Sequence, residues 1–307
     1  MRRLLILAAA ALAIGPLAMS GSIAAGRTGT SSQAALPPFG HVFLIIGENK
    51  SLFQLTSGNA PYIMKTLKPR SAWFTNYKNV ARGSAANYVA LTSGQFDSCE
   101  TTGPCTQKVP SIFSQLGNGK WKDWNESMPS NCYRGNAGSD AAFNPYKPGH
   151  NPALTYIGLS CSTYDVPAGT TAPNNMEFFN GDLAKGTVPK YNLITPNLCE
   201  ASYHACTGKQ NIVTEYDNFL RREIPLIEAS PAFGSNSVIF VTYDEGYVPT
   251  HNFNTMMAVT GPQVRKGTYA GAYNHYSAFA TMEKGLGLRC LAHACSAKTF
   301  PIFAASP

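Results

Sequence analysis

Charged residues are scarce in this sequence: Asp, Glu, Lys and Arg together make up 13% of its 307 residues. So low a share is unusual for a cytosolic enzyme and common among secreted ones. The formal net charge is +7, but the basic residues are scattered along the chain and form no basic stretch. We therefore expect no nucleic-acid partner, because such proteins gather Lys and Arg on one face or segment.

Long apolar runs are also missing, except at the start of the chain. There Met-Arg-Arg precedes the apolar segment Leu4–Leu17, a pattern typical of a secretory signal peptide and too short to cross a bilayer comfortably. We expect a signal peptide over 1–25, a mobile Gly/Ser/Thr/Ala-rich segment over 26–37, and a single domain over 38–307. The mature chain is then expected to be secreted, to the extracellular space or periplasm, as a monomer without an integral membrane segment.

No Cys-x-x-Cys motif occurs, which argues against a zinc knuckle. All eight cysteines follow the expected signal peptide, and this usage is typical of an oxidising compartment. Their spacing favours local disulfides, although spacing does not establish connectivity. The pairs we expect are Cys99 with Cys105, Cys132 with Cys161, Cys199 with Cys206, and Cys290 with Cys295.

Two apolar runs, Val42–Ile46 and Ser237–Tyr243, are the clearest secondary-structure signals. Neither alternates with polar residues, so each is predicted to be a strand buried on both faces, as in a parallel sheet. Strand and helix patterns alternate along the chain, which predicts an α/β fold with a mainly parallel central sheet flanked by helices. Further strands are expected near 72–77, 121–124, 191–195 and 256–259, and helices near 60–67, 85–92, 110–116, 211–227 and 275–286.

Oxygen-bearing side chains follow both clear strands at once: Glu48 and Asn49 after the first, Asp244 and Glu245 after the second. Ligands of open α/β sheets gather at the carboxyl edge of the strands. If the two strands are neighbours, four oxygen donors converge there, and their carboxylates would repel one another unless a cation lay between them. This predicts a divalent metal site; the alternative is that each pair only opens a loop or caps a helix.

Ser84 is expected at the N-cap of the helix near 85–92, which ends at Gly94. A hydroxyl at a helix N-terminus lies where backbone N–H groups and the helix dipole favour phosphate. A bound metal would also activate it as a nucleophile. An ordinary capping serine is the alternative.

Three histidines, His150, His204 and His275, are candidates for contacting phosphate oxygens or protonating a leaving group. His150 falls in the long stretch 125–175, which is rich in Gly, Pro, Asn and Ser and is expected to form loops. For any one of these histidines, a surface or packing role is the alternative.

Taken together, these segments resemble the phosphoesterase family of secreted bacterial acid phosphatases and C-type phospholipases, over about residues 38–290. The resemblance rests on motifs that occur in the family's order. They are His41-Val-Phe-Leu-Ile-Ile-Gly-Glu-Asn-Lys-Ser, Asn87-Tyr-Val-Ala-Leu-Thr-Ser-Gly, Pro148-Gly-His-Asn-Pro, Thr195-Pro-Asn-Leu-Cys, Val241-Thr-Tyr-Asp-Glu-Gly and Asn274-His-Tyr-Ser.

The resemblance implies an alkaline-phosphatase-like α/β sandwich that hydrolyses phosphate esters, with a small phosphorylated molecule or a phospholipid head group as substrate. It assigns the metal to Glu48, Asn49, Asp244 and Glu245. It assigns the nucleophile to Ser84, and its catalytic histidines to His150, His204 and His275, with Asn87 among the substrate-binding residues. The metal's identity stays open.

The sequence also departs from the family's pattern. An Asn-Asp-x-His-Asp run is replaced by Glu200-Ala-Ser-Tyr-His204-Ala205, which lacks both aspartates, and the usual His-Pro-Ser is Arg82-Gly83-Ser84. The usual histidine after the second strand aligns near His251. Two hypotheses follow: Arg82 holds a substrate phosphate, and Glu200 replaces a missing carboxylate.

The main interpretation is a secreted, metal-assisted phosphomonoesterase that forms a phosphoserine at Ser84. A C-type phospholipase is the first alternative, although the family's long phospholipases carry C-terminal domains that this chain lacks. A non-catalytic phosphate-ligand-binding homologue is the second, because two aspartates of the pattern are missing.

Overall fold

The computed structural model describes residues 36–96, 106–138, 145–206, 208, 211–246 and 253–303. They belong to one compact unit, Ala34–Pro307. The expected signal peptide, the Cys99–Cys105 pair and His251 lie outside the described residues.

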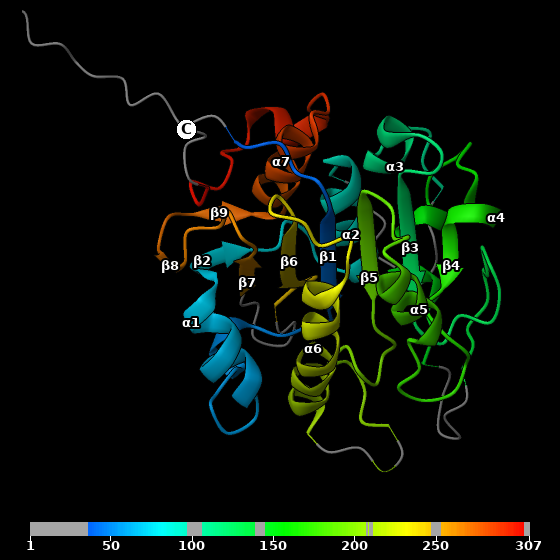
Figure 1. Ribbon diagram of the computed structural model, residues 1–307, viewed down its shortest axis with the longest axis horizontal. Coiled ribbons are helices and arrows are strands. Elements are labelled where there is room, and N and C mark those ends of the chain that lie inside the picture. Colours follow the sequence, from blue (N-terminus) through cyan, green and yellow to red (C-terminus); the bar gives the residue numbers. More distant parts are fainter. Residues whose placement is uncertain are drawn as a thin grey trace, which may run out of the picture. The chain divides into compact units, whose positions relative to one another are not determined.

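A nine-stranded sheet forms the centre of this unit (Figure 1). Its order is β4-β3-β5-β1-β6-β7-β2-β8, and β9 also pairs with β2. β7 runs antiparallel to both its neighbours, and the other pairs are parallel. The strands are β1 (Val42–Gly47), β2 (Ala72–Lys78), β3 (Trp121–Asn125), β4 (Asp165–Pro167), β5 (Tyr191–Thr195), β6 (Val238–Tyr243), β7 (Asn254–Thr260), β8 (Gly267–Tyr269) and β9 (Tyr273–Asn274).

Helices and short helical turns connect the strands. The helices are α1 (Lys68–Arg70), α2 (Ser84–Ser93), α3 (Ile112–Leu116), α4 (Cys161–Tyr164), α5 (Glu177–Lys185), α6 (Ile212–Ala229) and α7 (His275–Leu286). The turns are η1 (Leu52–Gln54), η2 (Ile63–Leu67), η3 (Pro148–His150), η4 (Pro152–Leu154) and η6 (Ala292–Ser296).

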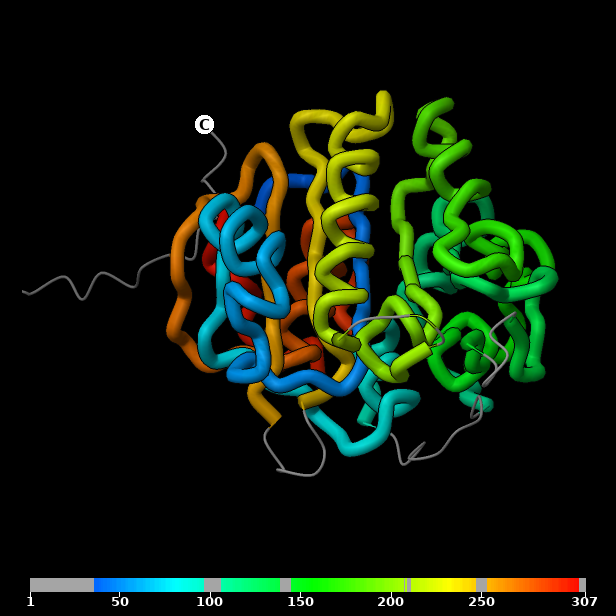
Figure 2. The backbone as a smooth tube through the Cα atoms, turned by 90° about the horizontal axis from the view of Figure 1, so that it is seen from below, coloured from blue at the N-terminus to red at the C-terminus, as the bar shows by residue number. Residues whose placement is uncertain are grey.

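Apolar and polar residues do not alternate in β1 because every residue of this strand is buried. Helices cover both faces of the sheet at this strand. Val42, Leu44 and Ile46 pack into one apolar cluster with α2, α3 and α7. Phe43 and Ile45 pack into a second cluster with η2, α5 and α6. In Figure 1 and Figure 2, α6 runs alongside the central strands. The α/β fold with a mainly parallel sheet, predicted from the sequence, is confirmed.

The strands expected from apolar runs are all present, within a residue or two of the predicted bounds. The short strands β4, β8 and β9, and helix α5, were not expected. They have two to nine residues, too few for a strong periodic signal, and the strands exist because neighbouring strands pair with them. The disulfides Cys132–Cys161, Cys199–Cys206 and Cys290–Cys295 are present as predicted.

One boundary prediction is wrong. Helix α2 begins at Ser84, and the N-cap is Gly83, whose φ is 90° and ψ is 132°. An L-residue rarely adopts this backbone conformation, whereas glycine does so without a steric cost. Ser84 is therefore the first helical residue rather than the cap, and its hydroxyl is not used to close the helix end.

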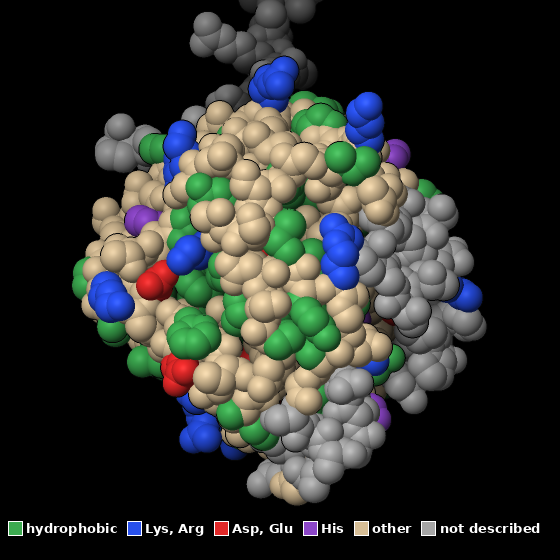
Figure 3. Space-filling model, turned by 90° about the vertical axis from the view of Figure 1, so that its right-hand side faces the viewer, with side chains coloured by type: hydrophobic (Ala, Val, Ile, Leu, Met, Phe, Trp, Pro, Cys, Tyr) green, Lys and Arg blue, Asp and Glu red, His purple; other side chains and the backbone are tan. Residues whose placement is uncertain are grey.

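Basic residues remain scattered in three dimensions on the face drawn in Figure 3, where Lys and Arg side chains lie singly and not in one patch. Within the described part of the chain, no helix is long and apolar enough to cross a membrane.

Candidate active site

Strands β1 and β6 are parallel neighbours, with Gly47 opposite Tyr243, so the residues that follow each strand lie side by side. The Asn49 backbone N–H donates to Asp244 Oδ1 at 2.9 Å. Both the Glu48 and the Asp244 side chains are fully buried, and Asp244 is close enough that its charge, after burial, raises the pKa of Glu48. The convergence predicted from the two strand ends is therefore present.

Ser84 points into this carboxylate pair from the N-terminal end of α2. Its Oγ donates to Glu48 Oε2 at 2.9 Å. The Gly83 N–H donates to Glu245 Oε2 at 3.1 Å, a bond that the proline of the related motif has no N–H to make. The glycine at this position thus ties Glu245 to the start of the helix.

The second oxygen of Glu48 is held by an aromatic pair. The Tyr88 hydroxyl donates to Glu48 Oε1 at 2.7 Å, and His150 Nδ1 lies 3.3 Å from the same atom. The rings of Tyr88 and His150 are stacked, with centroids 5.7 Å apart. Burial lowers the pKa of His150 to about 3, so this imidazole is neutral and acts through hydrogen bonding and packing.

Burial also dominates the charges of the cluster. It raises the pKa of Glu48 well above its ordinary value, and the charge of Asp244 raises it further. Burial and then Asp244 raise the pKa of Glu245 to about 8. The ammonium of Lys50 is buried beside these groups and interacts favourably with Asp244 and Glu48. The cluster thus holds more carboxylates than the one lysine balances.

Two of the four predicted metal ligands have a side-chain oxygen without a partner. Asn49 Oδ1 and Asp244 Oδ2 are buried without any hydrogen-bond partner, and a buried oxygen left unpaired is costly unless a cation or proton meets it. Carboxylate and amide oxygens suit a hard divalent ion. Among the described residues, no group of three or more His, Cys, Asp or Glu side chains is arranged around one metal position. The donor chemistry and the two unpaired oxygens fit a cation.

His275 lies behind the cluster rather than beside the substrate. It is fully buried; its Nε2 hydrogen-bonds the Asp244 carbonyl, and its Nδ1 lies 2.7 Å from the Tyr77 hydroxyl. Burial lowers its pKa to about 4. A neutral ring with both nitrogens engaged cannot easily protonate a leaving group, so the geometry favours a supporting role at Asp244.

Asn87, expected to bind substrate, is committed to the loop before Ser84. Its Oδ1 accepts from the N–H groups of Val80 and Ala81, and its Nδ2 donates to the carbonyls of Ala81 and Gly83. Arg82 in this loop is exposed, and its charge lowers the pKa of Glu245. Asn87 therefore shapes the loop that presents Ser84, and Arg82 lies exposed on the same loop.

His204 is exposed, and its Nδ1 lies 3.1 Å from the Ala205 carbonyl. The adjacent Tyr203 is closer to the centre. Its ring packs edge-on against His150, with centroids 6.1 Å apart. Burial raises the pKa of Tyr203, and the charges of Glu48, Asp244 and Glu245 raise it further.

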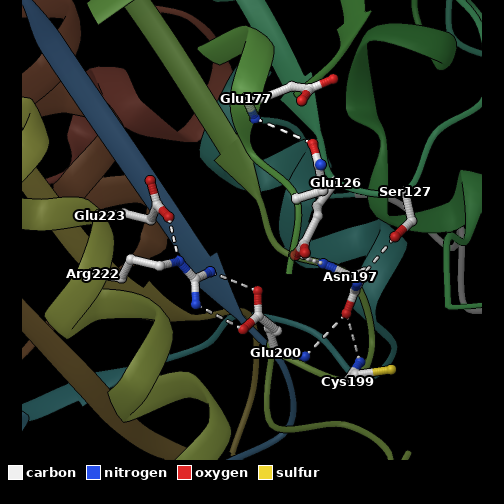
Figure 4. Close-up of polar contacts among 9 residues, drawn as sticks. Glu126, Ser127, Glu177, Asn197, Cys199, Glu200, Arg222 and Glu223 are labelled. Carbon is white, nitrogen blue, oxygen red and sulfur yellow. Dashed lines mark hydrogen bonds and ion pairs between the residues drawn. The ribbon is translucent and has the colours of Figure 1, made fainter. Parts of the chain in front are cut away.

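Glu200 does not replace a missing ligand, which corrects the hypothesis drawn from the sequence. Both its oxygens bond Arg222 of α6, at 3.1 and 2.7 Å, and Arg222 also bonds Glu223 at 2.7 Å. Figure 4 shows this ion-paired group beside Asn197, whose Oδ1 accepts from the N–H groups of Cys199 and Glu200. These contacts hold the loop that contains Glu200 and Ala201. The Ala201 carbonyl accepts a hydrogen bond from the Glu48 N–H, so the loop supports the backbone of Glu48 from outside the site.

Sequence reasoning missed Lys50, Tyr88 and Tyr203. Lys50 follows Glu48-Asn49 directly, and a lysine beside two expected ligands was a readable sign of charge balance. Tyr88 is one helical turn after Ser84, a spacing that puts both side chains on one face of α2. Nothing in the sequence marks Tyr203, because the loop geometry alone brings it to His150.

The fold is similar to that of solved α/β proteins of alkaline-phosphatase type. A solved member of the alkaline phosphatase superfamily from Vibrio parahaemolyticus superposes with a TM-score of 0.58 at 14% identity, covering 83% of this chain and 70% of that one. Murine ectonucleotide pyrophosphatase/phosphodiesterase 5 superposes with a TM-score of 0.54 at 10% identity, covering 82% and 96%. At such low identities, these likenesses concern the fold alone.

The family model that matches, over residues 56–289, is that of the Phosphoesterase family. The chain belongs to this family, as the resemblance predicted. Its curated relatives include an acid phosphatase of Aspergillus fumigatus, 24% identical over 85% of this chain and 60% of that one. Another is a phosphatidylinositol-3-phosphatase of Mycobacterium tuberculosis, 25% identical over 87% and 83%. The chain thus spans about three fifths of the length of the Aspergillus relative.

Proposed function

We propose that this protein is a secreted phosphatase that hydrolyses phosphate monoesters through Ser84, assisted by a divalent cation. The observation that carries the proposal is the 2.9 Å hydrogen bond from Ser84 Oγ to the buried Glu48 carboxyl at the N-terminal end of α2. A hydroxyl so placed has a proton acceptor behind it and the positive end of a ten-residue helix around it.

In the proposed reaction, the substrate phosphate lies against the N-terminal end of α2, within reach of Arg82 at the rim. Ser84 Oγ attacks phosphorus as its proton passes to Glu48 Oε2, and the bond from phosphorus to the leaving oxygen breaks. Water then attacks the phosphorus of the resulting phosphoserine, and the bond from phosphorus to Ser84 Oγ breaks. Glu48 returns its proton to Ser84 Oγ, and phosphate is released with the water's oxygen and protons. Charge on the phosphoryl oxygens is what such a site must stabilise most.

Glu48, Asn49 and Asp244 would hold the cation, with Glu245 as the fourth candidate donor. When bound, the cation supplies charge stabilisation for the phosphate and favours the ionised form of the nucleophile. Tyr88 and His150 orient Glu48 through its Oε1 atom, and Lys50 balances part of the negative charge. His275 supports Asp244 from behind, which leaves His204 as the histidine proposed to protonate the leaving oxygen.

Both relatives named above are described as phosphatases, which supports a monoester substrate over the phospholipase C alternative. The mycobacterial relative is described as acting on a phosphoinositide, so a phosphorylated inositol head group is among the substrates we propose, beside small soluble monoesters.

Turnover of p-nitrophenyl phosphate and bis(p-nitrophenyl) phosphate, each with added divalent ions and with chelator, tests the proposal. We expect the monoester to be preferred, chelator to suppress its turnover, and Ser84→Ala to lower kcat at least about a thousandfold, as loss of a nucleophile does. Ser93→Ala, at the other end of α2, is the matched control and should retain full activity.

Other outcomes would contradict the proposal in distinct ways. Preference for the diester would favour the phospholipase-type alternative. Silence on both substrates across a series of metals would favour the phosphate-binding homologue. Full activity of Ser84→Ala would remove the nucleophile from the scheme.

A further inference from the structure

A cavity of about 620 Å³ lies at the carboxyl end of β2, on the same sheet edge as Ser84. Residues of β2, β9 and α7 line it, together with residues of η6 and of the segment that follows η6. β6 and β2 are parallel to each other because β7 runs antiparallel to both. With one strand between them, their carboxyl ends are about 10 Å apart.

Among the described residues that line this cavity, none is Asp or Glu, and the charged ones are basic. Lys78, Lys298 and His293 supply the basic groups, and the remaining polar groups are Asn, Ser and Tyr side chains. Lys78 and Lys298 are exposed, and within the described part of the chain neither takes part in an ion pair. The carboxylates of the proposed active site lie in the Glu48 cluster, and the two lysines of the cavity lie one step along the sheet edge.

A second feature marks the cavity as a place for an anion. Tyr276 is one of the residues that line the cavity, and its hydroxyl oxygen is buried without a hydrogen-bond partner. Burial raises the pKa of Tyr276 to about 12, so this group stays a neutral donor. An unmatched donor beside two uncommitted ammonium groups is what a phosphate or carboxylate would satisfy.

The cavity is joined to the proposed active site by a short hydrogen-bonded path. Asn79 lines the cavity, accepts from the Gly246 N–H at 3.2 Å, and donates to the Ala81 carbonyl at 2.6 Å. Gly246 follows Glu245, and Ala81 is three residues before Ser84. A molecule that occupies both the cavity and the position beside Ser84 therefore needs to span only the loop of residues 79–83.

We propose that the cavity binds a second anionic group, of the phosphate class, carried by the substrate of Ser84. This inference rests on the proposed function for the position of the first phosphate. It narrows the substrate class to small molecules or head groups that bear two anionic groups, either two phosphates or a phosphate and a carboxylate. The two groups would be about 10 Å apart, as are the carboxyl ends of β6 and β2. Lys78, Lys298 and the Tyr276 hydroxyl are the groups that recognise the second anion.

The test compares fructose 1,6-bisphosphate with fructose 6-phosphate, and uses p-nitrophenyl phosphate as the single-phosphate reference. We expect kcat/KM to be at least about tenfold higher for the bisphosphate, since each charge-assisted contact contributes severalfold. The double variant Lys78→Ala/Lys298→Ala should lose that preference and keep p-nitrophenyl phosphate turnover. Lys65→Ala is the matched control. Lys65 is an exposed lysine on η2, and η2 packs in the apolar cluster that contains Phe43 and Ile45.

Calorimetric titration of the Ser84→Ala protein with the same two sugars separates this inference from the proposed function. We expect the bisphosphate to bind about tenfold more tightly, and the two lysine substitutions to abolish the difference. Equal affinity for the two sugars would overturn the inference even if monoester turnover is high. If Ser84→Ala binds the bisphosphate more tightly but the wild-type protein hydrolyses none of the substrates, the anion site is retained and the phosphatase proposal is overturned.

Discussion

Lys50 shows how a single residue decides the electrostatics of the site. Its ammonium is buried and faces the charges of Asp244 and Glu48, and its Nζ donates to the Asn49 carbonyl at 3.1 Å. Several buried carboxylates would repel one another strongly without a nearby cation. Lys50 supplies one positive charge, and the proposed metal would supply the rest.

We therefore predict that Lys50→Gln destabilises the chelator-treated protein by about 2–3 kcal/mol, because it leaves a buried charge without its partner. Urea denaturation measures this effect, and Lys65→Gln on the surface should change stability little. Saturating divalent cation should narrow the gap between wild type and Lys50→Gln, since the ion then meets the same carboxylates. A gap that is unchanged by cation would contradict a metal site at Glu48 and Asp244.

The loop that carries His150 shows how separate elements position one catalytic candidate. Asn151, the next residue, donates to Asp165 Oδ1 of β4 at 2.8 Å, and the Ala153 N–H donates to Asp123 Oδ2 of β3 at 3.2 Å. Asn125 Nδ2 bridges the two aspartates at 3.1 Å each. A buried acidic pair on two adjacent strands thus anchors the segment that brings His150 to Glu48.

This anchor predicts a pH-dependent stability. Burial raises the pKa of Asp165 from 3.8 to about 7, with Arg134 and the Asn125 and Asn151 amides opposing the rise; Asp123 faces it with a pKa that is also raised. The folded state therefore binds more protons than the unfolded state between about pH 4 and pH 7, so this group's contribution to stability falls as pH rises through that window. Each pKa unit corresponds to about 1.4 kcal/mol.

Asp165→Asn isolates the effect. Relative to wild type, this variant should gain stability as pH rises from 4.5 to 8, because it cannot ionise, and urea denaturation at several pH values measures the difference. Glu177→Gln, at an exposed carboxylate, should track wild type at every pH. A difference between Asp165→Asn and wild type that stays constant with pH would show that Asp165 ionises normally in the folded protein.

On the scale of the whole molecule, disulfides restrain the loops around the carboxyl edge. Cys132–Cys161 closes a segment of sequence separation 29 that includes His150, and Cys199–Cys206 closes the loop with Tyr203 and His204. Cys290–Cys295 spans a separation of 5 near η6. Longer closed loops remove more entropy from the unfolded chain.

We predict that removing Cys132–Cys161 by a double Cys→Ser substitution costs about 3.6 kcal/mol, against about 2.2 kcal/mol for Cys290–Cys295, from the loop-length relation. Denaturant melts of the two variants, with wild type as reference, measure the order. The longer-loop variant should also lose phosphatase activity more readily on warming, because His150 is released with its segment. The reverse order of stabilities would mean that native contacts, and not loop closure, dominate.

Local sequence was sufficient for the elements that carry strong patterns. Continuous apolar runs predicted β1 and β6, because strands covered on both faces need apolar residues at every position. The oxygen donors that follow each run are fixed in place by chain connectivity, so Glu48, Asn49, Asp244 and Glu245 were predicted to gather at one edge. Ser84 was found through its place at the start of a helix.

Contacts between distant segments decided the rest. Asn87 proved to shape a loop, His275 to brace a backbone carbonyl, and Glu200 to pair with Arg222, because each has a partner far away in the chain or one that only the folded loop presents. Local patterns record the propensity of a segment and not the position of its neighbours. The place of the candidate site at the sheet edge could therefore be predicted from the residues, whereas the contacts of each side chain depend on which segments folding brings together.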